Sequence, residues 1–564
     1  MTNTARARPE AARAIAVAAA LYVVALLVRL FAAAQVEFPI AEPSAYYVAV
    51  AQNLVEGRGL VSDTLWSYAT PPLVVPRPAF ELWLPMSSFV SALAMGLLGA
   101  SFWAAQVGGA LLGALVAPLA WAVAREAARV TGLDARRSAS VAVASGLLGA
   151  IMAPLVLTSV VPDSSTPFLV FMLIAALLMP RALGVDGDAV EVTSRRRGTA
   201  WGLGLGVVMG LAYLSRQEVI WLGLTFLVML AWMLRDRPST ERASEGLARL
   251  WPVVAGGLIV VLPWLVRNAA EFGSPFPGQA VENLFFARNE DVFAFTERPS
   301  LVRYLGEGLV TVLGNPLSAA WQQLVEVLLL PAFPVGLAGL VAVVGMRRAT
   351  TLRRPTALSA LLVSGGLTFL GTALLFPVAT RWGTFLHASG PLLVGLIVAA
   401  ALGADALVAR LSELRHWQRP NVILGPIALV AVSALLGWFQ LGLLAERASA
   451  QQARYDDIAA GISATAESAG LLVPATLITD HPMWLAEALD RRAVALPDEG
   501  LASIMALSRT FEAPWLVVVD ERGRYPSALL DGSTDGCLAG PPVRITTSDS
   551  PAWLFRLAEQ CRPA

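Results

Sequence analysis

The chain has 564 residues, of which 56% are hydrophobic and 15% are charged, and its mean hydropathy is +0.64. This composition is too apolar for a soluble, fibrous or disordered protein of this length and indicates a polytopic membrane protein. Basic and acidic residues balance at 41 each, which argues against a nucleic-acid-binding protein. The two cysteines and three histidines are far apart in the sequence and lack zinc-ligand spacing, so no zinc cluster is expected.

Eleven stretches are apolar and close to the length of a membrane span, which takes ~20 residues. The first, 12–34, ends in alanines that resemble a signal-peptide cleavage site. It is long for a signal peptide, contains Arg29 and is followed by further spans, so we expect a retained anchor. The other ten stretches lie at 104–124, 139–160, 166–184, 199–214, 218–234, 250–266, 322–346, 357–378, 384–404 and 421–444.

A twelfth apolar stretch, 79–100, contains Glu81 and Pro85, and the arginines decide its placement. If it does not cross the membrane, the loops on the side of the N-terminus hold 22 arginines and the opposite loops hold 8. Cytoplasmic loops are rich in basic residues, so this arrangement fits every loop. We therefore predict that 79–100 is interfacial or re-entrant, that the N-terminus is cytoplasmic and that the C-terminus is extracytoplasmic.

This topology predicts a mainly α-helical transmembrane domain, 1–445, and a small extracytoplasmic α/β domain, 446–564. The transmembrane domain has two long outer loops, a first loop at 35–103 and a second loop at 267–321. In the first loop we expect Ser44 to be the N-cap of a helix that lies flat on the membrane surface.

The tail begins with a polar, alanine-rich helical stretch and then alternates apolar and helical runs. The apolar runs are 476–479, 493–496 and 515–519, and the helical ones are 483–489 and 501–507. This βαβα order predicts the α/β domain. Cys537 and Cys561 both fall in it, on the predicted oxidising side, where a disulfide between them is plausible.

Ionisable residues gather at the predicted outer ends of the spans. They are Glu42, Asp163, Arg216, Glu218, Arg267, Arg381 and His387. Any one of them is explained by the ordinary polarity of loops, but together they predict the rim of one extracytoplasmic cavity. Within the spans Arg29 and Glu326 are the clear charges, whereas a coupled transporter usually keeps ionisable residues at the bilayer midplane.

Several strings resemble the GT-C superfamily of integral-membrane glycosyltransferases, which includes protein O-mannosyltransferases and lipid A aminoarabinose transferases. They are Glu42–Tyr47 continuing into Val50–Gly59, Val161–Asp163, Leu214–Glu218, Pro263–Asn268 with Phe272–Pro277, and the tail segment with Arg491, Ala493, Val494 and Pro497. One departure is that the family presents an Asp closer to the paired tyrosines, where this chain has Pro43 and Ser44.

The resemblance implies sugar transfer from a polyprenyl-phosphate donor, with inversion, through an oxocarbenium-like state. Glu42 is then the candidate general base, and Asp163 would orient the acceptor or hold a divalent cation. Three arginines would bind the phosphate, namely Arg216, Arg267 and Arg381. Glu218 and His387 would lie beside them in the substrate site. Tyr46 and Tyr47 either stack on the sugar or anchor the loop at the membrane interface, and we favour anchoring.

The sequence therefore predicts a hexosyl- or pentosyltransferase of a bacterial cytoplasmic membrane, acting on the extracytoplasmic side. Its partners would be the lipid donor, membrane lipids and an acceptor glycan, lipid or protein. A divalent cation is the one cofactor considered. The alternatives are a catalytically silent GT-C homologue that serves as a binder or scaffold, and a polytopic transporter or lipid flippase.

Overall fold

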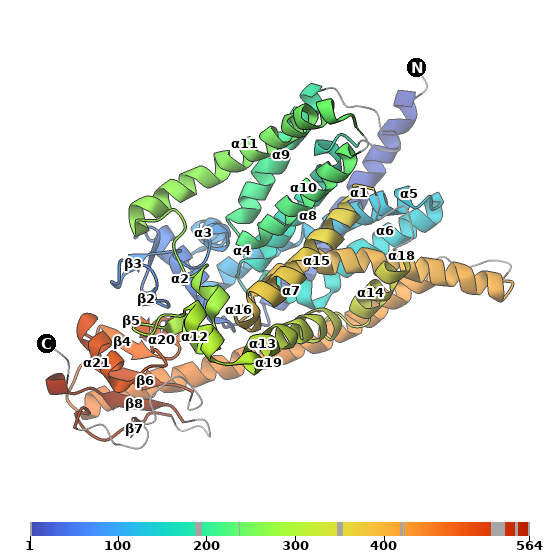
Figure 1. The fold of residues 1–564 in the computed structure, drawn as a ribbon. Helices are drawn as coiled ribbons and strands as arrows, with labels where there is room; N and C mark the ends of the chain where they lie inside the picture. Colours follow the sequence, from blue (N-terminus) through green and yellow to red (C-terminus); the bar gives the residue numbers. More distant parts are fainter. Residues whose placement is uncertain are drawn as a thin grey trace.

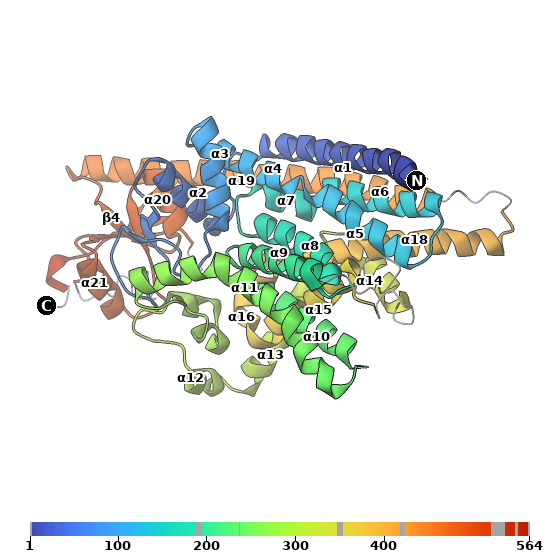
Figure 2. The same cartoon turned by 90° about the horizontal axis from the view of Figure 1, so that it is seen from above.

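The protein is an elongated helical bundle with a small mixed sheet at one end (Figure 1). The computed structural model describes residues 3–185, 195–235, 237–346, 354–417, 421, 423–520, 529, 536–546 and 551–561. Figure 2 shows the long helices running side by side along the bundle, with the sheet and α21 at one end, where α19 continues alongside the sheet. The chain is therefore mainly α-helical with a C-terminal sheet, as predicted.

The bundle consists of long helices, several of which are broken or bent. They are α1 (Asn3–Ala33), α4 (Phe102–Gly113), α5 (Val116–Val130), α6 (Ala135–Ile151), α7 (Ala153–Val160), α8 (Ser165–Ala182), α9 (Arg195–Tyr213), α10 (Ile220–Leu234), α11 (Ser239–Phe272), α14 (Val335–Met346), α15 (Ala357–Leu375), α18 (Gly390–Leu414) and α19 (Leu424–Ser468). A π-helical segment, Gln323–Leu329, precedes α14.

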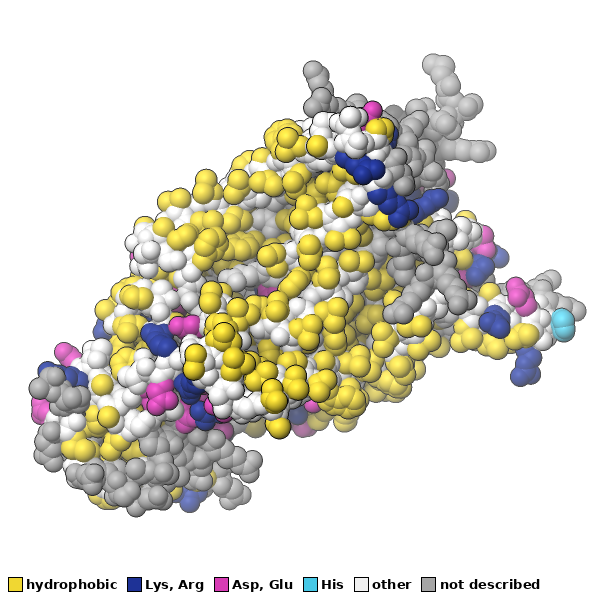
Figure 3. All heavy atoms as spheres, in the orientation of Figure 1, with side chains coloured by type: hydrophobic (Ala, Val, Ile, Leu, Met, Phe, Trp, Pro, Cys, Tyr) yellow, Lys and Arg dark blue, Asp and Glu magenta, His cyan; other side chains and the backbone are white. Residues whose placement is uncertain are grey.

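Eight of the described helices are long and apolar enough to cross a membrane, or nine if the bent pair α6–α7 forms one span. The two other predicted spans correspond to shorter apolar helices, Gly198–Tyr213 and Val335–Met346. The chain is thus a polytopic integral membrane protein. In Figure 3 apolar side chains cover the middle of the visible face, and charged ones gather towards its two ends.

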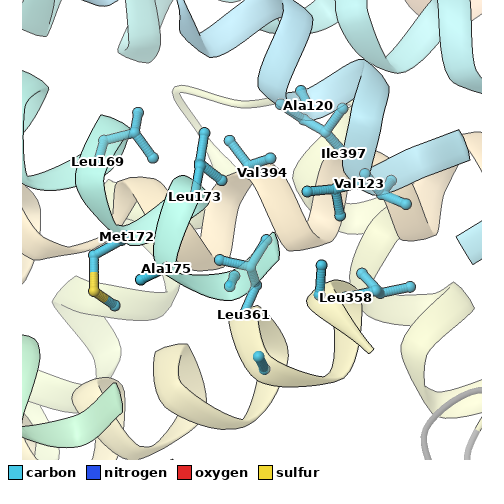
Figure 4. Packing of buried hydrophobic residues seen from close by; sticks show 14 of the residues in the cluster. Ala120, Val123, Leu169, Met172, Leu173, Ala175, Leu358, Leu361, Val394 and Ile397 are labelled. Atoms are coloured by element: carbon cyan, nitrogen blue, oxygen red, sulfur yellow. The ribbon is translucent and has the colours of Figure 1, made fainter. Parts of the chain in front are cut away.

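The centre of the bundle is packed with small and branched apolar side chains from α5, α8, α15 and α18 (Figure 4). Helices α9 and α11 approach especially closely because α9 carries Gly202, Gly206 and Gly210 at four-residue intervals. A Cβ on Gly206 would overlap the Val253 carbonyl oxygen of α11. Small residues at this spacing allow backbones to pack in membrane helices.

The first loop contains two short helices, α2 (Glu42–Val55) and α3 (Met86–Leu98), and the strands β1 (Val61–Ser62), β2 (Thr64–Leu65) and β3 (Arg77–Pro78). The prediction that Ser44 caps α2 is wrong: the N-cap is Ala41, and Ser44 lies inside the first turn. The helix starts earlier because Pro43 is tolerated there, since the first N–H groups have no helical partner.

Helix α3 occupies part of the stretch 79–100 and has only 13 residues. At 1.5 Å per residue it is roughly 20 Å long, shorter than the ~30 Å hydrocarbon core. It packs against α2 and α4, and the Met86 N–H donates to the Leu214 carbonyl at the end of α9. Whether it crosses the membrane stays a prediction.

The second loop contains α12 (Leu301–Gly306) and α13 (Leu309–Gln322), and the turn before α18 contains α16 (Pro377–Arg381) and α17 (Thr384–Ala388). The tail contributes α20 (Pro482–Leu489), α21 (Leu501–Thr510), β4 (Thr476–Thr479), β5 (Arg492–Ala495), β6 (Trp515–Val518), β7 (Val543–Arg544) and β8 (Trp553–Arg556). These bounds closely match the strands and helices predicted between 476 and 519.

The sheet of the tail has the order β2-β5-β4-β6-β8-β7. Strands β2, β5, β4 and β6 are parallel, and β8 and β7 continue antiparallel. The edge strand β2 comes from the first loop, with Leu65 opposite Val494. Cys537 and Cys561 form a disulfide. The first loop and the tail thus share one sheet.

Candidate active site

Asp163 lies in the short turn between α7 and α8 and is 6% exposed. One carboxylate oxygen accepts a hydrogen bond from the Ser165 N–H at 2.5 Å. The other lies 2.9 Å from Nδ1 of His387, at the end of α17. The structure therefore brings together two predicted site residues that are 224 positions apart, and both oxygens of Asp163 are engaged.

Arg216 lies between α9 and α10 and reaches the same turn. Its guanidinium donates to the Ser164 hydroxyl at 2.8 Å, to Glu218 at 2.6 Å and to the Thr384 carbonyl oxygen at 3.3 Å. Burial opposes its charge, but Glu218, Tyr47 and Asp163 raise the pKa of Arg216 above its ordinary value. The arginine is consequently a fixed cation, and its Nε has no hydrogen-bond partner among the described residues.

Tyr47 covers this cluster from α2 and is 1% exposed. Burial raises the pKa of its hydroxyl, Arg216 lowers it, and Asp163 raises it further, so the phenol stays protonated. Ser164 is a hydrogen-bond partner of the hydroxyl. We call the group formed by Tyr47, Asp163, Arg216, Glu218 and His387 the polar cluster.

Glu42, the predicted base, has other partners. Its Oε1 lies 2.5 Å from Nδ1 of His481, which precedes α20 in the tail. The carboxyl is 6% exposed, and its Oε2 has no hydrogen-bond partner among the described residues. Glu42 and Tyr47 are five residues apart on α2, which corresponds to roughly 7.5 Å along the helix axis.

Tyr46 faces a second buried group in the first loop. Its hydroxyl accepts the Phe80 N–H at 2.7 Å, and Glu81 forms an ion pair with Arg77 at 3.1 Å. Burial raises the pKa of Glu81, and Arg77 and Arg267 lower it in part. Because Tyr46 is 4% and Tyr47 1% exposed, the favoured role of these rings as anchors among lipid headgroups is wrong.

The three predicted phosphate-binding arginines have different partners. Arg267 lies over the Trp264 and Phe272 rings, at 5.0 and 5.2 Å from their centres, and donates to Asn268. Arg381 is exposed and donates to Ser318 of α13 at 2.5 Å. Of the three, Arg216 is the one that belongs to the polar cluster, through its hydrogen bond to Glu218.

An apolar crevice of about 540 Å³ lies between α9, α10 and α11. Its lining includes Gly206, Gly210 and Tyr213 of α9 and Val219 at the start of the next span. The Arg216 turn, residues 214–218, therefore joins two segments whose apolar residues line the crevice. A cationic turn that is connected to an apolar crevice in this way suits an amphipathic lipid with an anionic head.

The described residues contain no group of three or more His, Cys, Asp or Glu side chains that could hold a metal ion. Each oxygen of Asp163 already has a partner, so the described residues offer no preformed ligand set for the cation considered from the sequence. Sequence reasoning missed Ser164, Thr384 and His481. Ser164 follows an acidic motif residue and could have been included, but Thr384 contributes a backbone oxygen, which leaves no signal in the sequence.

Residues 77–266 match the family model described as dolichyl-phosphate-mannose-protein mannosyltransferase. This segment contains the polar-cluster residues Asp163, Arg216 and Glu218. The predicted resemblance to the GT-C superfamily of membrane glycosyltransferases is therefore confirmed. No curated protein matches the chain in sequence.

The fold is similar to that of ArnT from Cupriavidus metallidurans. The structure bound to undecaprenyl phosphate has 15% identity and a TM-score of 0.55 and covers 97% of this chain and 99% of that one. The apo structure has 16% identity and a TM-score of 0.52 and covers 99% and 100%. At this identity the likeness establishes a shared fold over nearly the whole chain.

Proposed function

We propose that the protein transfers a sugar from a polyprenyl-phosphate donor to an acceptor hydroxyl on the extracytoplasmic side of a bacterial cytoplasmic membrane. The observation that carries the proposal is that Arg216 belongs to the polar cluster and lies in the turn that joins α9 to the next span, two segments whose apolar residues line the crevice. The phosphate would bind Arg216, and the polyprenyl chain would lie in the crevice. The undecaprenyl phosphate bound by the similar ArnT is a lipid of this kind.

Burial and charge suit Arg216 to this role. It is fixed by Glu218, Ser164 and Thr384, so little side-chain freedom is lost when a phosphate arrives. A preorganised guanidinium stabilises the charge that develops on the phosphate as the bond to the sugar breaks. The Asp163–His387 pair holds the turn that carries Ser164 and would orient the reacting groups beside it.

Glu42 remains our candidate for the base, because its Oε2 is buried and has no hydrogen-bond partner in the part of the chain that the structure describes. Both oxygens of Asp163 are engaged, and Glu81 pairs with Arg77. In an inverting displacement the base and the leaving group lie on opposite sides of the anomeric carbon. Glu42 lies five residues before Tyr47 on α2, and Tyr47 interacts with Arg216, so a base and a phosphate site that are spaced along this helix support the arrangement.

Release of polyprenyl phosphate tests the proposal, because this product is the same for every sugar and acceptor. Purified protein in lipid nanodiscs would be given undecaprenyl-phosphate hexoses and pentoses together with extracted cell envelope. We expect release by the native chain and a loss of about 10²-fold or more in Glu42→Gln, the scale of general-base catalysis.

Binding of undecaprenyl phosphate, followed by tryptophan fluorescence, tests the lipid site separately. We expect Arg216→Lys to weaken binding because Lys lacks the planar fork of Arg, whereas Arg410→Lys, an exposed control on α18, leaves it unchanged. Equal binding in both variants would refute the role of Arg216. Tight binding with no release from any donor would favour the catalytically silent binder instead.

A further inference from the structure

His481 of the tail lies against Glu42, the predicted base, although the two residues are 439 positions apart in the sequence. Nδ1 of His481 lies 2.5 Å from Oε1 of Glu42, and the two side chains are 28% and 6% exposed. A carboxylate oxygen accepts, so Nδ1 is the donor in this pair. Hydrogen bonds of an imidazole to a carboxylate are charge-assisted when either group is ionised and are then short and strong.

The pair leaves Glu42 with one engaged and one unengaged oxygen. Oε2 is buried and has no hydrogen-bond partner among the described residues. A buried carboxylate oxygen without a donor is costly, so it needs an explanation. Asp163 shows the contrast, because a backbone N–H and His387 engage its two oxygens.

His481 is held firmly at the carboxyl end of the central strand β4. Asp480, the residue before it, accepts hydrogen bonds from the Val519 and Asp520 N–H groups at 2.8 to 3.2 Å. The imidazole packs against Trp484, whose indole N–H donates to the Pro39 carbonyl oxygen at 2.7 Å. The start of α20 therefore contacts the first loop both at Pro39, before α2, and at Glu42, the first residue of α2.

The sheet also fixes the chain that follows the carboxyl end of α2. Strand β2 follows α2 in the first loop and pairs with β5, and the Tyr68 hydroxyl donates to the Ala495 carbonyl oxygen. The position of Glu42 is thus set by the tail at Pro39, at His481 and at β2. A side chain fixed in this way loses little freedom when a substrate binds.

We infer that His481 is a positioning residue for Glu42: its Nδ1–H holds Oε1 of the carboxylate so that Oε2 can take the proton of the acceptor hydroxyl. This inference rests on the proposed function. As the acceptor oxygen bonds to the anomeric carbon, its proton passes to Oε2. The bond from that carbon to the phosphate oxygen breaks, and the electron pair leaves with the polyprenyl phosphate.

The first test observes His481 directly and needs no enzymatic assay. The chain has three histidines, so the signal of each can be assigned. Histidine labelled with ¹⁵N would be followed by NMR, and His387→Asn, His416→Asn and His481→Asn would assign the signals. We expect a strongly downfield Nδ1 proton for His481 that disappears in Glu42→Gln and persists in Asp163→Asn. A His481 signal of the Nε2–H tautomer, unchanged by Glu42→Gln, would overturn the inference.

The second test compares variants that differ in one donor. His481→Ala removes the Nδ1–H, whereas the amide of His481→Asn can place a donor near the same point. Misplacement of a catalytic group by about 1 Å costs roughly 10²-fold, so we expect kcat for polyprenyl phosphate release to fall about 10²-fold in His481→Ala with little change in KM. His481→Asn should recover a large part of this loss.

Two controls separate positioning from docking of the tail. Trp484→Phe removes the bond to Pro39 and keeps the imidazole, and His416→Asn changes an exposed histidine elsewhere. If Trp484→Phe lowers kcat as much as His481→Ala, or if His481→Asn fails to recover activity, His481 acts only in docking and the inference fails. A failure of the base role in the proposed function would give a different result, because Glu42→Gln would then also leave polyprenyl phosphate release unchanged.

Discussion

Arg29 is a buried charge inside the first span, and its removal should destabilise the bend between α6 and α7. Its side chain is fully buried and donates five hydrogen bonds, to the Ser159 hydroxyl and to the carbonyl oxygens of Ala25, Gly149, Ala150 and Leu155. The α6–α7 pair is bent by 44°. The guanidinium thus lies at the carboxyl end of α6, where a cation is favoured.

Pro154 explains why an arginine is needed there. In a continuous helix the Ala150 carbonyl would accept from the N–H of residue 154, but proline has none. Arg29→Met would leave the carbonyls of Gly149 and Ala150 without donors. Each orphaned buried group costs ~1–3 kcal/mol, so the variant should lose roughly 2–6 kcal/mol of unfolding free energy.

The assay is unfolding in mixed detergent micelles, followed by tryptophan emission. Arg13→Met, at an exposed position of the same helix, is the matched control and should stay within about 0.5 kcal/mol of the native chain. Pro154→Ala should be less harmful in the Arg29→Met background than in the native one, because it restores an N–H beside Ala150. Equal stability of Arg29→Met and Arg13→Met would refute the reasoning.

Three further predictions concern topology, the second loop and the polar cluster. Since the chain has no free cysteine, an impermeant thiol reagent should label Leu472→Cys in intact cells and leave Arg136→Cys unlabelled. Arg136 is exposed and lies in a loop that we predict to be cytoplasmic, so the reverse labelling pattern would invert the predicted topology. Burial alone would raise the pKa of Glu499, but hydrogen bonds from Thr296 and its neighbours lower it below its ordinary value. The stability that these hydrogen bonds to the Glu499 carboxylate contribute is therefore fully present above the usual Glu pKa of about 4.3. It is lost as the pH falls through the lower pKa of the folded state. Hydrogen exchange of the amides at 295–297 should therefore accelerate at low pH and in Glu499→Gln, and unchanged protection would contradict this. Asp163→Asn replaces one of the two acceptor oxygens by an NH₂ donor, so it should slow polyprenyl phosphate release more than tenfold while undecaprenyl phosphate binding at Arg216 is retained. Loss of binding with normal release would exclude the assigned roles.

Much of the fold could be predicted because hydrophobic length and periodicity are local signals. The stretch 476–479 coincides with β4, and the predicted spans correspond to described helices or helix pairs. The pairing of strands that are far apart in the sequence could not be predicted in this way. Nothing near Thr64 indicates that this short segment joins β5 of the tail, since a two-residue edge strand has almost no pattern of its own. The Glu42–His481 contact is hidden for the same reason, because it depends on that shared sheet.

The site residues show a second limit. Ends of spans that lie on one side of a membrane can be assigned from arginine counts, but the direction of each side chain around its helix cannot. Arg216 enters the polar cluster because its short turn places it against Ser164, whereas Arg267 stacks on Trp264 one helical turn earlier. Arg381 instead reaches α13. To predict that these arginines share one cavity requires the rotation of each side chain about its helix, and the sequence lacks that information.

Helix α2 connects the two halves of the proposed chemistry. Its first residue, Glu42, is held by the tail, and Tyr47 belongs to the polar cluster together with Arg216. A helix fixes both the rise and the rotation between such positions, so the separation of base and phosphate does not depend on a flexible loop. Since β2 follows α2 into the sheet, any displacement of the tail would carry Glu42 with it relative to Arg216. The tail is therefore part of the geometry of the site as much as the bundle is.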